Sequence, residues 1–495
     1  MNVANHIDLA ARDVSEETAI VDPQRSLTYE DLAEETDAVA NALAELGIEA
    51  GDRIALYLPN SVAFVTTYFG AVKRGAIPVP INMRLQQEGI EYVLGGAGAR
   101  AIVTTGQFKD HFANTTVDGL EHLVVVDGNE GHQYSSLVEA ADTEYRVYPR
   151  KGDELLGLMY TSGTTGRPKG VKRTHRNMGT NSHAMNLCMG WSRHDIGLTV
   201  NPCFHVSGLN VTLAPLLLAR AENYFMPAWD PEDALAVIEK RAVTTTFCIM
   251  TIAIDLLNCE SAGDYDTSSL RTFGAGGSPM PSDRIEAFER KFDCVLLEGY
   301  GMTETTANGA INRFDQDGRK PGSVGPPAKG VIDLRIEEPE TGARVDEGGR
   351  SELLWRGDVV TTGYYNMARK ESGGVRRAGG RAVAALGGYR ALGRGRTLVR
   401  RGPGRRRDHL ERGERLPEWR RGRTLRDRRY TGGRSARNPA RPPRRDGNGG
   451  RCPFGREYYR GVDRAGLSGP PRRVRTLAAD RVHRGDAEDL DAEDQ

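Results

Sequence analysis

Apolar and polar residues follow two spacings along the first 370 positions, and these spacings predict helices and strands in alternation. Residues 29–46 carry apolar side chains at helical spacing. Thr28 is a good N-cap residue for this helix, and Gly47 supplies a C-terminal stop. Residues 61–75 predict a second helix of the same kind.

Short apolar runs between these helices predict strands. They lie at 53–59, 77–82, 100–105, 122–127, 155–160 and 243–247. A further helix is expected from Pro231 onward, with Asp230 as its cap. Strands separated by helices of this length are typical of mainly parallel sheets covered on both faces, so the pattern predicts an α/β fold.

After about Lys370 this pattern stops, because arginine and glycine replace the periodic apolar residues. Residues 371–495 contain 33 arginines, no lysine and 16 acidic residues, whereas residues 1–370 contain 34 basic and 51 acidic residues. The neutral total therefore hides an acidic body and a basic tail, and we expect a domain boundary near Lys370. The periodicity supports no fold for the tail.

The six cysteines form no CxxC pair and show no metal-ligand spacing, which favours reduced thiols. The N-terminal residues lack the basic start and apolar run of a signal peptide. No apolar run approaches the length of a membrane span. These observations predict a soluble cytoplasmic protein, and the sequence leaves open whether it forms a homodimer.

Residues 155–177 carry the most specific chemistry. An apolar strand ends in the string YTSGTTGRPKGV, and the pattern then predicts a helix. Glycines allow backbone N–H groups to approach an anion, while hydroxyl groups and Lys169 add donors and positive charge. The spacing is not that of a Walker loop. The complete string therefore predicts a phosphate site. A fragment of it would be explained equally well by an ordinary surface loop.

This string resembles the signature of the adenylate-forming, or AMP-binding, enzymes, which include acyl- and aryl-CoA synthetases such as fatty-acid and 4-coumarate–CoA ligases. Five more segments follow in the family's order: NPCFHVSGLN, GAGGSPMP, EGYGMTETT, GSVGPP and ELLWRG–TTGYYN. The resemblance covers residues 1–370. It implies two mostly parallel sheets with helices, a small β-barrel, and a small α+β C-terminal domain.

The resemblance also implies an activity. The family uses ATP and Mg²⁺ to convert a carboxylic acid into an acyl-adenylate, and most members then form a thioester with coenzyme A. The matching ATP- or AMP-binding positions are Thr161, Ser162, Gly163, Thr164, Thr165, Gly166, Lys169, Gly274, Ala275, Gly276, Glu298, Gly299, Tyr300, Gly301, Met302 and Thr303.

The family also implies a catalytic set of Lys169, His205, Thr303 and Glu304. Glu304 matches the magnesium ligand, with Thr165 beside it, and a hard cation prefers such oxygen ligands. Tyr300 matches the residue that flanks adenine. The acyl pocket would be lined by His205, Val206, Gly276 and Gly301. Taken singly, Glu304 could be a solvated carboxylate, and His205 or Tyr300 could be core residues.

The acid is not identified by the sequence. The form FHVSGL is common among CoA ligases for fatty or aryl acids, and no acidic residue is placed to hold an amino group. An enzyme with another acyl acceptor, or one that activates an aryl acid for a carrier protein, stays an alternative.

The tail departs from the family. The family's ribose-binding aspartate motif, its glycine-rich SGENVYP-like turn and its late lysine are missing after residue 371. Permitted codons for residues 382–389, 394–402 and 407–422 can be chosen so that a shift of one base restores successive family motifs in order. We therefore hypothesise a frameshift near Lys370, by sequencing error or mutation.

Two alternatives to an active ligase remain for the chain as written. The basic tail could bind nucleic acid, but the body is acidic and the tail has no lysine and no recognisable binding fold, so no nucleic-acid partner is expected. A pseudo-enzyme is the other alternative, because the lost domain should impair adenylation and thioester formation.

Overall fold

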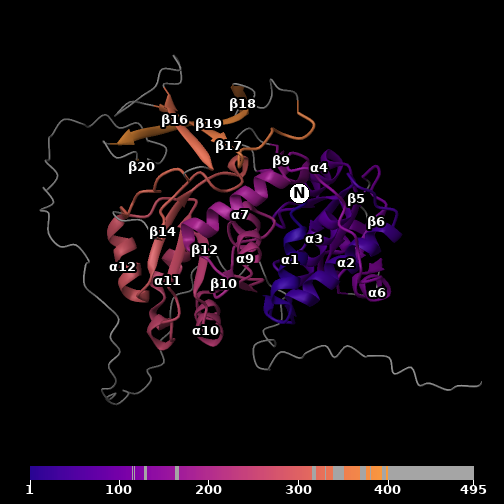
Figure 1. Ribbon diagram of the computed structural model, residues 1–495, viewed down its shortest axis with the longest axis horizontal. Coiled ribbons are helices and arrows are strands. Elements are labelled where there is room, and N and C mark those ends of the chain that lie inside the picture. Colours follow the sequence, from indigo (N-terminus) through magenta and orange to yellow (C-terminus); the bar gives the residue numbers. More distant parts are fainter. Residues whose placement is uncertain are drawn as a thin grey trace, which may run out of the picture. The chain divides into compact units, whose positions relative to one another are not determined.

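The computed structural model describes residues 1–113, 115, 117–127, 131–161, 167–314, 319–328, 331–337, 351–367, 375–378, 381–392 and 397–399. Helices and strands alternate through most of this range (Figure 1), as the spacing predicted. Residues 400–495 lie outside the described residues, so the frameshift hypothesis and the boundary at Lys370 stay predictions.

The first sheet is parallel throughout its five strands. Their order is β4 (Ile77–Pro80), β3 (Arg53–Tyr57), β5 (Ala99–Thr104), β6 (His122–Val125) and β7 (His132–Gln133). The helices of this part of the chain are α1 (Asn5–Val14), α2 (Tyr29–Glu45), α3 (Val62–Arg74), α4 (Gln87–Ala97), α5 (Asp110–Ala113) and α6 (Tyr134–Ala140), with a short 3₁₀ turn η1 (Gly106–Phe108).

The predicted helix over 29–46 is confirmed as α2, and its start has a clear physical cause. The Thr28 side chain accepts a hydrogen bond from the Asp31 N–H, and the Asp31 carboxylate accepts one from the Thr28 N–H. This capping box satisfies two donors that a helix end leaves free. Gly47 follows the helix with a φ of 73°, in the left-handed region that suits glycine.

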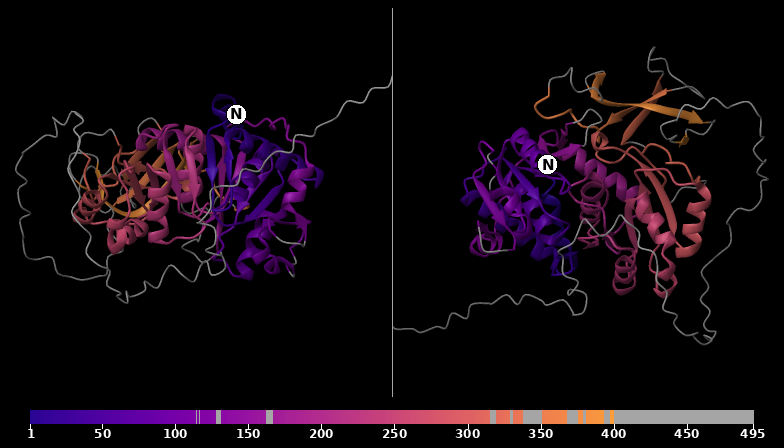
Figure 2. Two further views of the ribbon diagram at one scale, coloured as in Figure 1. Left: turned by 90° about the horizontal axis from the view of Figure 1, so that it is seen from below. Right: turned by 180° about the vertical axis from the view of Figure 1, so that it is seen from behind.

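The second sheet has eight strands and is parallel except at its two edges. Its order is β15 (Ala310–Ile311), β14 (Val295–Tyr300), β13 (Thr272–Gly276), β12 (Thr245–Ile249), β10 (Ile196–Thr199), β11 (Glu222–Phe225), β1 (Thr18–Val21) and β2 (Ser26–Thr28). Helices lie on both sides of its strands (Figure 2). The prediction of two mostly parallel sheets is confirmed.

Helices α7 (His175–Met189), α9 (Ala214–Ala219), α10 (Pro231–Arg241), α11 (Met250–Asn258) and α12 (Ser282–Phe292) accompany the second sheet. Shorter turns are α8 (Val206–Gly208), the π-helical η2 (Leu209–Leu213), η3 (Glu260–Asp264) and η4 (Thr303–Thr305). Asp230 caps α10 through its side chain, as predicted. One apolar core joins both sheets, since it includes Leu56 of β3 and Phe225 of β11.

One local prediction was wrong. The chain does not pass from the loop after residue 160 directly into a helix. It first forms β9 (Lys169–Thr174), which pairs antiparallel with β8 (Leu155–Thr161), and α7 begins only at His175. Pairing with β8 satisfies one edge of the β9 backbone, residues 363–365 bond to its other edge, and Thr174 caps the helix through its side chain.

The third sheet is antiparallel. It contains β16 (Ile332–Glu337), β17 (Ser351–Gly357), β19 (Arg381–Leu392) and β18 (Val375–Ala378), with β20 (Thr397–Val399) paired to β19. Among the described strands these pairings form an open sheet and not the small barrel that the resemblance implied. Three of the strands follow residue 370, where periodicity predicted none, because backbone pairing does not require a regular side-chain pattern.

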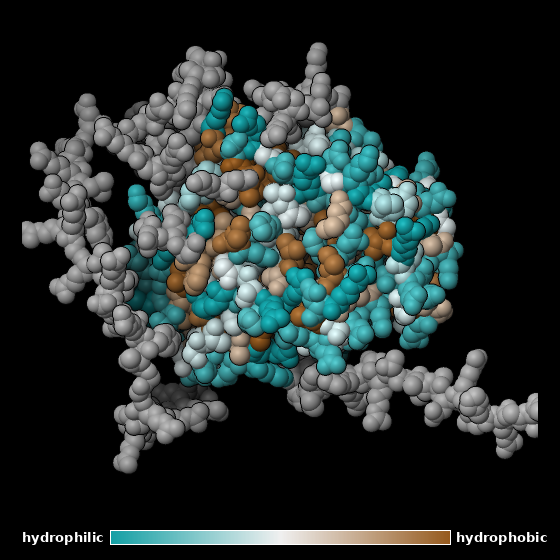
Figure 3. Space-filling model, in the orientation of Figure 1, coloured by the Kyte–Doolittle hydropathy of each residue, from teal (hydrophilic) through white to brown (hydrophobic). Residues whose placement is uncertain are grey.

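All five cysteines in the described part of the chain are free thiols, as expected. Within the same residues, no helix combines the length and apolarity that a membrane crossing requires. On the face drawn in Figure 3, apolar residues are scattered among polar ones.

Candidate active site

The predicted phosphate loop joins the two strands of the β8–β9 hairpin. Thr161 ends β8, Lys169 begins β9, and the two residues are paired across the hairpin. Ser162, Gly163, Thr164, Thr165 and Gly166 lie outside the described residues. The hairpin therefore fixes both ends of the loop, and the backbone donors expected within it stay a prediction.

Lys169 and Glu304 are brought together by a residue for which the sequence suggested no role. The Tyr364 hydroxyl donates a hydrogen bond to Glu304 Oε1 at 2.7 Å. Lys169 Nζ lies 5.3 Å from the centre of the Tyr364 ring, a cation–π distance. Burial, and then the charge of Glu304, raise the pKa of Tyr364, so its hydroxyl keeps its proton and remains a donor. A positive charge and a carboxylate thus flank one tyrosine.

The segment around Tyr364 fastens this cluster to two different elements. The Thr361 N–H donates to the Glu304 carbonyl at 2.8 Å, and the Thr361 hydroxyl donates to the Lys172 carbonyl at 2.6 Å. The Tyr365 N–H donates to the Gly170 carbonyl at 2.7 Å. Residues 361–365 therefore bind the β8–β9 hairpin on one side and the η4 turn on the other.

The carboxyl ends of β13 and β14 meet at one edge of the eight-stranded sheet, where Gly276 is paired with Gly299. Crevices outside such an edge are the usual ligand sites of parallel sheets. Three of the predicted nucleotide-site residues are fixed by packing here. Ala275 is fully buried, the Phe247 ring fills the space beside Gly274, and a Cβ on Gly301 would lie 1.6 Å from the Ala307 carbonyl oxygen.

Tyr300 stands at the end of β14, half-buried, with one face against the indole of Trp355. The ring centres are 5.8 Å apart and the planes differ by 26°. Met302 and Thr303 follow at the start of η4, where Thr303 is buried. Residues 300–303 therefore connect the end of β14 to η4 and position Glu304 next to Tyr364.

Glu298 lies in β14, one residue before Gly299, and is buried. Its Oε2 accepts a hydrogen bond from the Gly322 N–H at 2.7 Å. Burial raises the pKa of Glu298 to about 7, and the Gly322 N–H and Arg319 only partly offset that effect. Glu298 therefore fastens the 322–325 segment, and the structure gives it this role in addition to the nucleotide contact expected from the sequence.

His205 follows β10 at the same edge and is partly exposed to solvent. Its Nδ1 accepts a hydrogen bond from the Ser207 N–H at 3.2 Å, which places the proton of the neutral ring on Nε2. Loss of hydration from the surrounding protein lowers the pKa of His205, and the charge of Arg173 lowers it further. Near neutral pH the ring is an uncharged Nε2–H donor. Val206, next to it, is buried in the core.

The loop that carries His205 is held by two buried asparagines. Asn60 Nδ2 donates to the Asn201 carbonyl at 2.9 Å, and Asn60 Oδ1 accepts from the Cys203 N–H at 2.8 Å. Asn201 in turn donates to the Phe247 carbonyl at 2.9 Å. Asn60 was missed by the sequence reasoning, and its position just before the helix at 62 gave no signal.

The donor set fits a nucleotide with a magnesium ion. Among the described residues, no group of three His, Cys, Asp or Glu side chains could hold a metal by itself. Mg²⁺ commonly binds through one or two carboxylates, with phosphate oxygens and water completing its shell. Glu304 supplies one such carboxylate. The site therefore matches a magnesium ion bound together with phosphate oxygens, and not a metal ion held by protein side chains only.

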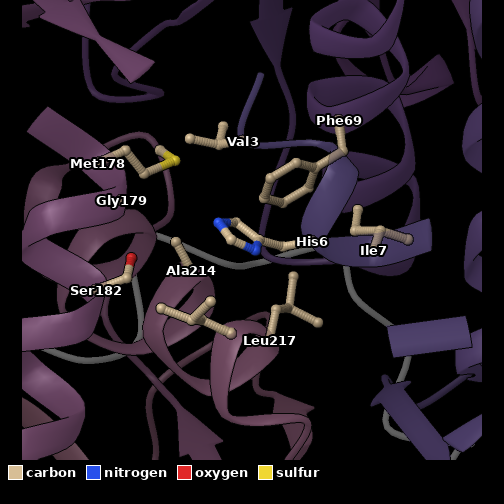
Figure 4. A pocket seen from close by; sticks show the side chains of 10 residues that line it. Val3, His6, Ile7, Phe69, Met178, Gly179, Ser182, Ala214 and Leu217 are labelled. Atoms are coloured by element: carbon tan, nitrogen blue, oxygen red, sulfur yellow. The ribbon is translucent and has the colours of Figure 1, made fainter. Parts of the chain in front are cut away.

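A small cavity that is lined by none of these cluster residues lies between α1, α3, α7 and α9 (Figure 4). His6, Phe69, Met178 and Leu217 are among the side chains that line it, and its volume is about 20 Å³. This volume suffices for a single water molecule. It is not a substrate pocket of the expected size.

Comparisons with known proteins identify the family of the chain. A family model described as AMP-binding enzyme matches residues 7–365. A feruloyl-CoA synthase from Amycolatopsis sp is 30% identical over 348 residues, which are 70% of this chain and 68% of that protein. A long-chain-fatty-acid–CoA ligase from Bacillus subtilis (strain 168) is 29% identical over 75% of this chain and 71% of its own length.

Among solved structures, ATP-bound MatB from Rhodopseudomonas palustris superposes with a TM-score of 0.72 and 26% identity. The match covers 81% of this chain and 78% of that one.

Proposed function

Because the chain belongs to the family of AMP-binding enzymes, we propose that it activates a carboxylic acid with ATP and transfers the acyl group to coenzyme A. Attack of the acid's carboxylate oxygen on the α-phosphorus of ATP forms the acyl-adenylate and releases pyrophosphate. The CoA thiol then displaces AMP from the acyl carbon, and the thiol proton is lost.

The Lys169–Tyr364–Glu304 cluster is the observation that carries this proposal. Lys169 would contact phosphate oxygens together with the 161–166 loop. Glu304, with Thr165, would hold a magnesium ion that neutralises charge as pyrophosphate leaves. Tyr364 lies between the two charged side chains. This arrangement supports binding of a magnesium–triphosphate complex, in which Lys169 would contact the phosphate oxygens and Glu304 the magnesium ion.

The remaining positions have roles at the sheet edge. Tyr300 would stack on adenine, and Gly276 with Gly299 would allow the nucleotide to approach the backbone. His205 would donate its Nε2 proton in a hydrogen bond to the acid's carboxylate, with Val206 lining the acyl chain.

The acid is an aryl or fatty acid in this proposal, since relatives that act on both classes match the chain to a similar degree. Transfer to another acceptor, such as a carrier protein, is the alternative. We propose further that the written tail, residues 371–495, impairs the reaction, because it lacks the family's late lysine and ribose aspartate.

The test is acid-dependent ATP–pyrophosphate exchange over a panel of aryl and fatty acids, with the written chain and with a chain whose reading frame is restored near Lys370. We expect weak exchange from the written chain and acyl-CoA from the restored one. Absence of exchange by the restored chain with every acid contradicts the proposed activity. Robust CoA ligation by the written chain contradicts the account of the tail.

A matched pair of variants tests the cluster. Glu304→Gln should lower exchange strongly, whereas Glu286→Gln, the same change on the exposed face of α12, should leave it unchanged. Resequencing and the intact mass of the native protein decide the frame. An unbroken frame that encodes the written tail would contradict the frameshift hypothesis.

A further inference from the structure

Arg173 is a buried cation, and two of its donor nitrogens have no hydrogen-bond partner among the described residues. It lies in β9 and is 3% exposed. Its Nε and Nη2 atoms are buried, and within the described residues neither has a hydrogen-bond partner. Nη1 has only a long contact of 3.9 Å to the sulfur of Met159. Burial lowers the pKa of Arg173 to about 10, so the side chain is still charged at neutral pH.

The two donor nitrogens without a partner, Nε and Nη2, can act together. Nε and Nη2 lie on the same edge of the guanidinium plane and form the fork that binds a carboxylate through two parallel hydrogen bonds. This protein uses the same fork elsewhere. Arg271 Nε and Nη2 donate to the two oxygens of the buried Asp195 at 2.8 and 2.7 Å. Arg173 presents the same pair of donors, and neither has a hydrogen-bond partner among the described residues.

An unpaired charge in this position is costly. Burial of an ion without a partner is among the strongest destabilising effects in proteins, and nearly all buried polar groups have partners. A water molecule could accept one hydrogen bond from the fork but would not neutralise its charge. The cost is accounted for if an anion fills the site during function.

Arg173 contacts Met159, which belongs to the same apolar cluster as Val206, a residue assigned to the acyl pocket. The charge of Arg173 lowers the pKa of His205, the residue assigned to the acid, after the larger effect of burial. It also acts on Tyr68 of α3, where it partly offsets the rise in the pKa that burial causes. Met159 and Tyr68 belong to the same apolar cluster as Val206.

The strand pattern fixes the face of β9 on which Arg173 lies. Side chains two apart share a face of a strand, so Lys169 and Arg173 lie on the same face of β9. They are four residues, or about 13 Å, apart along it. Gly157 is the residue paired with Arg173 across the hairpin, and the Pro78 carbonyl oxygen and the Tyr68 hydroxyl border the space beside it. One face of the hairpin thus carries Lys169 at one end and Arg173 at the other.

We propose that Arg173 binds a carboxylate of the acid substrate through Nε and Nη2. This inference rests on the proposed function and adds a specificity residue to it. The carboxylate can be the one that reacts, in a monocarboxylic acid, or a second one at the far end of a dicarboxylic acid. The chemistry of the fork is the same in both cases.

The experiment measures binding to the full chain by calorimetry, for the unchanged protein, Arg173→Met and Arg173→Lys. The ligands are ATP, a series of aryl and fatty monocarboxylic acids, dicarboxylic acids of matched length, and the corresponding carboxamides. Arg173→Met should weaken acid binding about 10- to 100-fold, as expected for loss of a charged hydrogen-bonded pair. Arg173→Lys should recover part of it, and carboxamide and ATP binding should not change.

This panel of acids distinguishes the reacting carboxylate from a second carboxylate at the far end of the substrate. Weakened binding of the monocarboxylic acids assigns the reacting carboxylate to Arg173, and weakening confined to the dicarboxylic acids assigns the second one. The inference would be overturned if Arg173→Met bound every acid as tightly as the unchanged protein does. It would also be overturned if the unchanged protein bound ATP but none of the acids. Absence of ATP binding counts against the proposed function instead.

Stability without ligand gives a second readout, because a purely structural arginine would behave differently. Arg173→Met removes an unpaired buried charge and should raise the midpoint of thermal unfolding by about a few degrees. Arg271→Met is the matched control and should lower the midpoint, since it leaves Asp195 buried without its cation. A lowered midpoint for Arg173→Met, comparable to that of the control, would contradict an anion site.

Discussion

Removal of one hydroxyl, in Tyr364→Phe, tests whether Glu304 is held in place for a metal–nucleotide complex. The hydroxyl makes a 2.7 Å hydrogen bond to Glu304 Oε1, while the ring itself contributes to the packing and to the contact with Lys169. Phenylalanine retains the ring, so only the hydrogen bond is lost. A hydrogen bond to a charged group contributes about 1.5–3 kcal/mol when it is well shielded. Tyr364 is buried but Glu304 is half-buried, so we take the lower end, about 1.5 kcal/mol.

A loss of about 1.5 kcal/mol corresponds to roughly a tenfold weaker interaction. We therefore expect Tyr364→Phe to raise the Kd of Mg²⁺–ATP about tenfold, measured by calorimetry at fixed free Mg²⁺, and to alter ATP binding much less when Mg²⁺ is absent. The control is Tyr365→Phe, whose hydroxyl has no hydrogen bond among the described residues. Equal affinities for both variants and the unchanged protein would refute the role of the Tyr364 hydroxyl, and equal losses in both would show a general effect on packing.

Three further changes test the packing of the site. Asn60→Ala leaves the Cys203 N–H and the Asn201 carbonyl without their partner, so it should lower the free energy of unfolding by about 1–3 kcal/mol in urea denaturation; an unchanged midpoint would count against the Asn60 anchor. Gly301→Ala places a Cβ 1.6 Å from the Ala307 carbonyl oxygen and should be strongly destabilising, whereas Gly179→Ala, in the interior of α7 with no heavy atom within 4 Å of the new Cβ, should stabilise by about 0.5–1 kcal/mol in the same assay. The native pKa of Glu298, about 7, is raised above its ordinary value, so the native state binds the proton more tightly and stability should fall as pH rises from about 4.5 to about 7. Glu298→Gln should remove this part of the pH dependence of the unfolding midpoint, and an identical slope in both proteins would contradict it.

Much of this architecture could be predicted from the sequence because it rests on local rules. Thr28 and Asp230 identified helix starts by capping chemistry, and the apolar runs identified strands whose parallel pairing follows from the intervening helices. The hairpin strand β9 was missed because its run of glycine, lysine and arginine lacks the apolar alternation of a strand.

The candidate site was predictable only in part. Lys169, His205 and Glu304 were recognised through family motifs, and their roles stay predictions. Tyr364 was quoted within a motif but received no role, because its contacts with Lys169 and Glu304 join segments 195 and 60 residues away. Arg173 was overlooked for a different reason. An arginine in a basic run is usually solvated, and only the fold shows that this one is buried.

The attachment of residues 361–365 to both the hairpin and η4 has a consequence for shortened forms of the chain. A form that ends before Thr361 would lose the bonds to Lys172, Gly170 and Glu304 at once, and its two ligand-facing parts would no longer be joined at this point. A form that ends just after Asn366 would retain all of them, together with the bond from Asn366 to the Gly96 carbonyl. Asn366 is therefore the earliest end point for a fragment intended to bind nucleotide, and the arginine-rich tail can be removed without loss of any of these contacts.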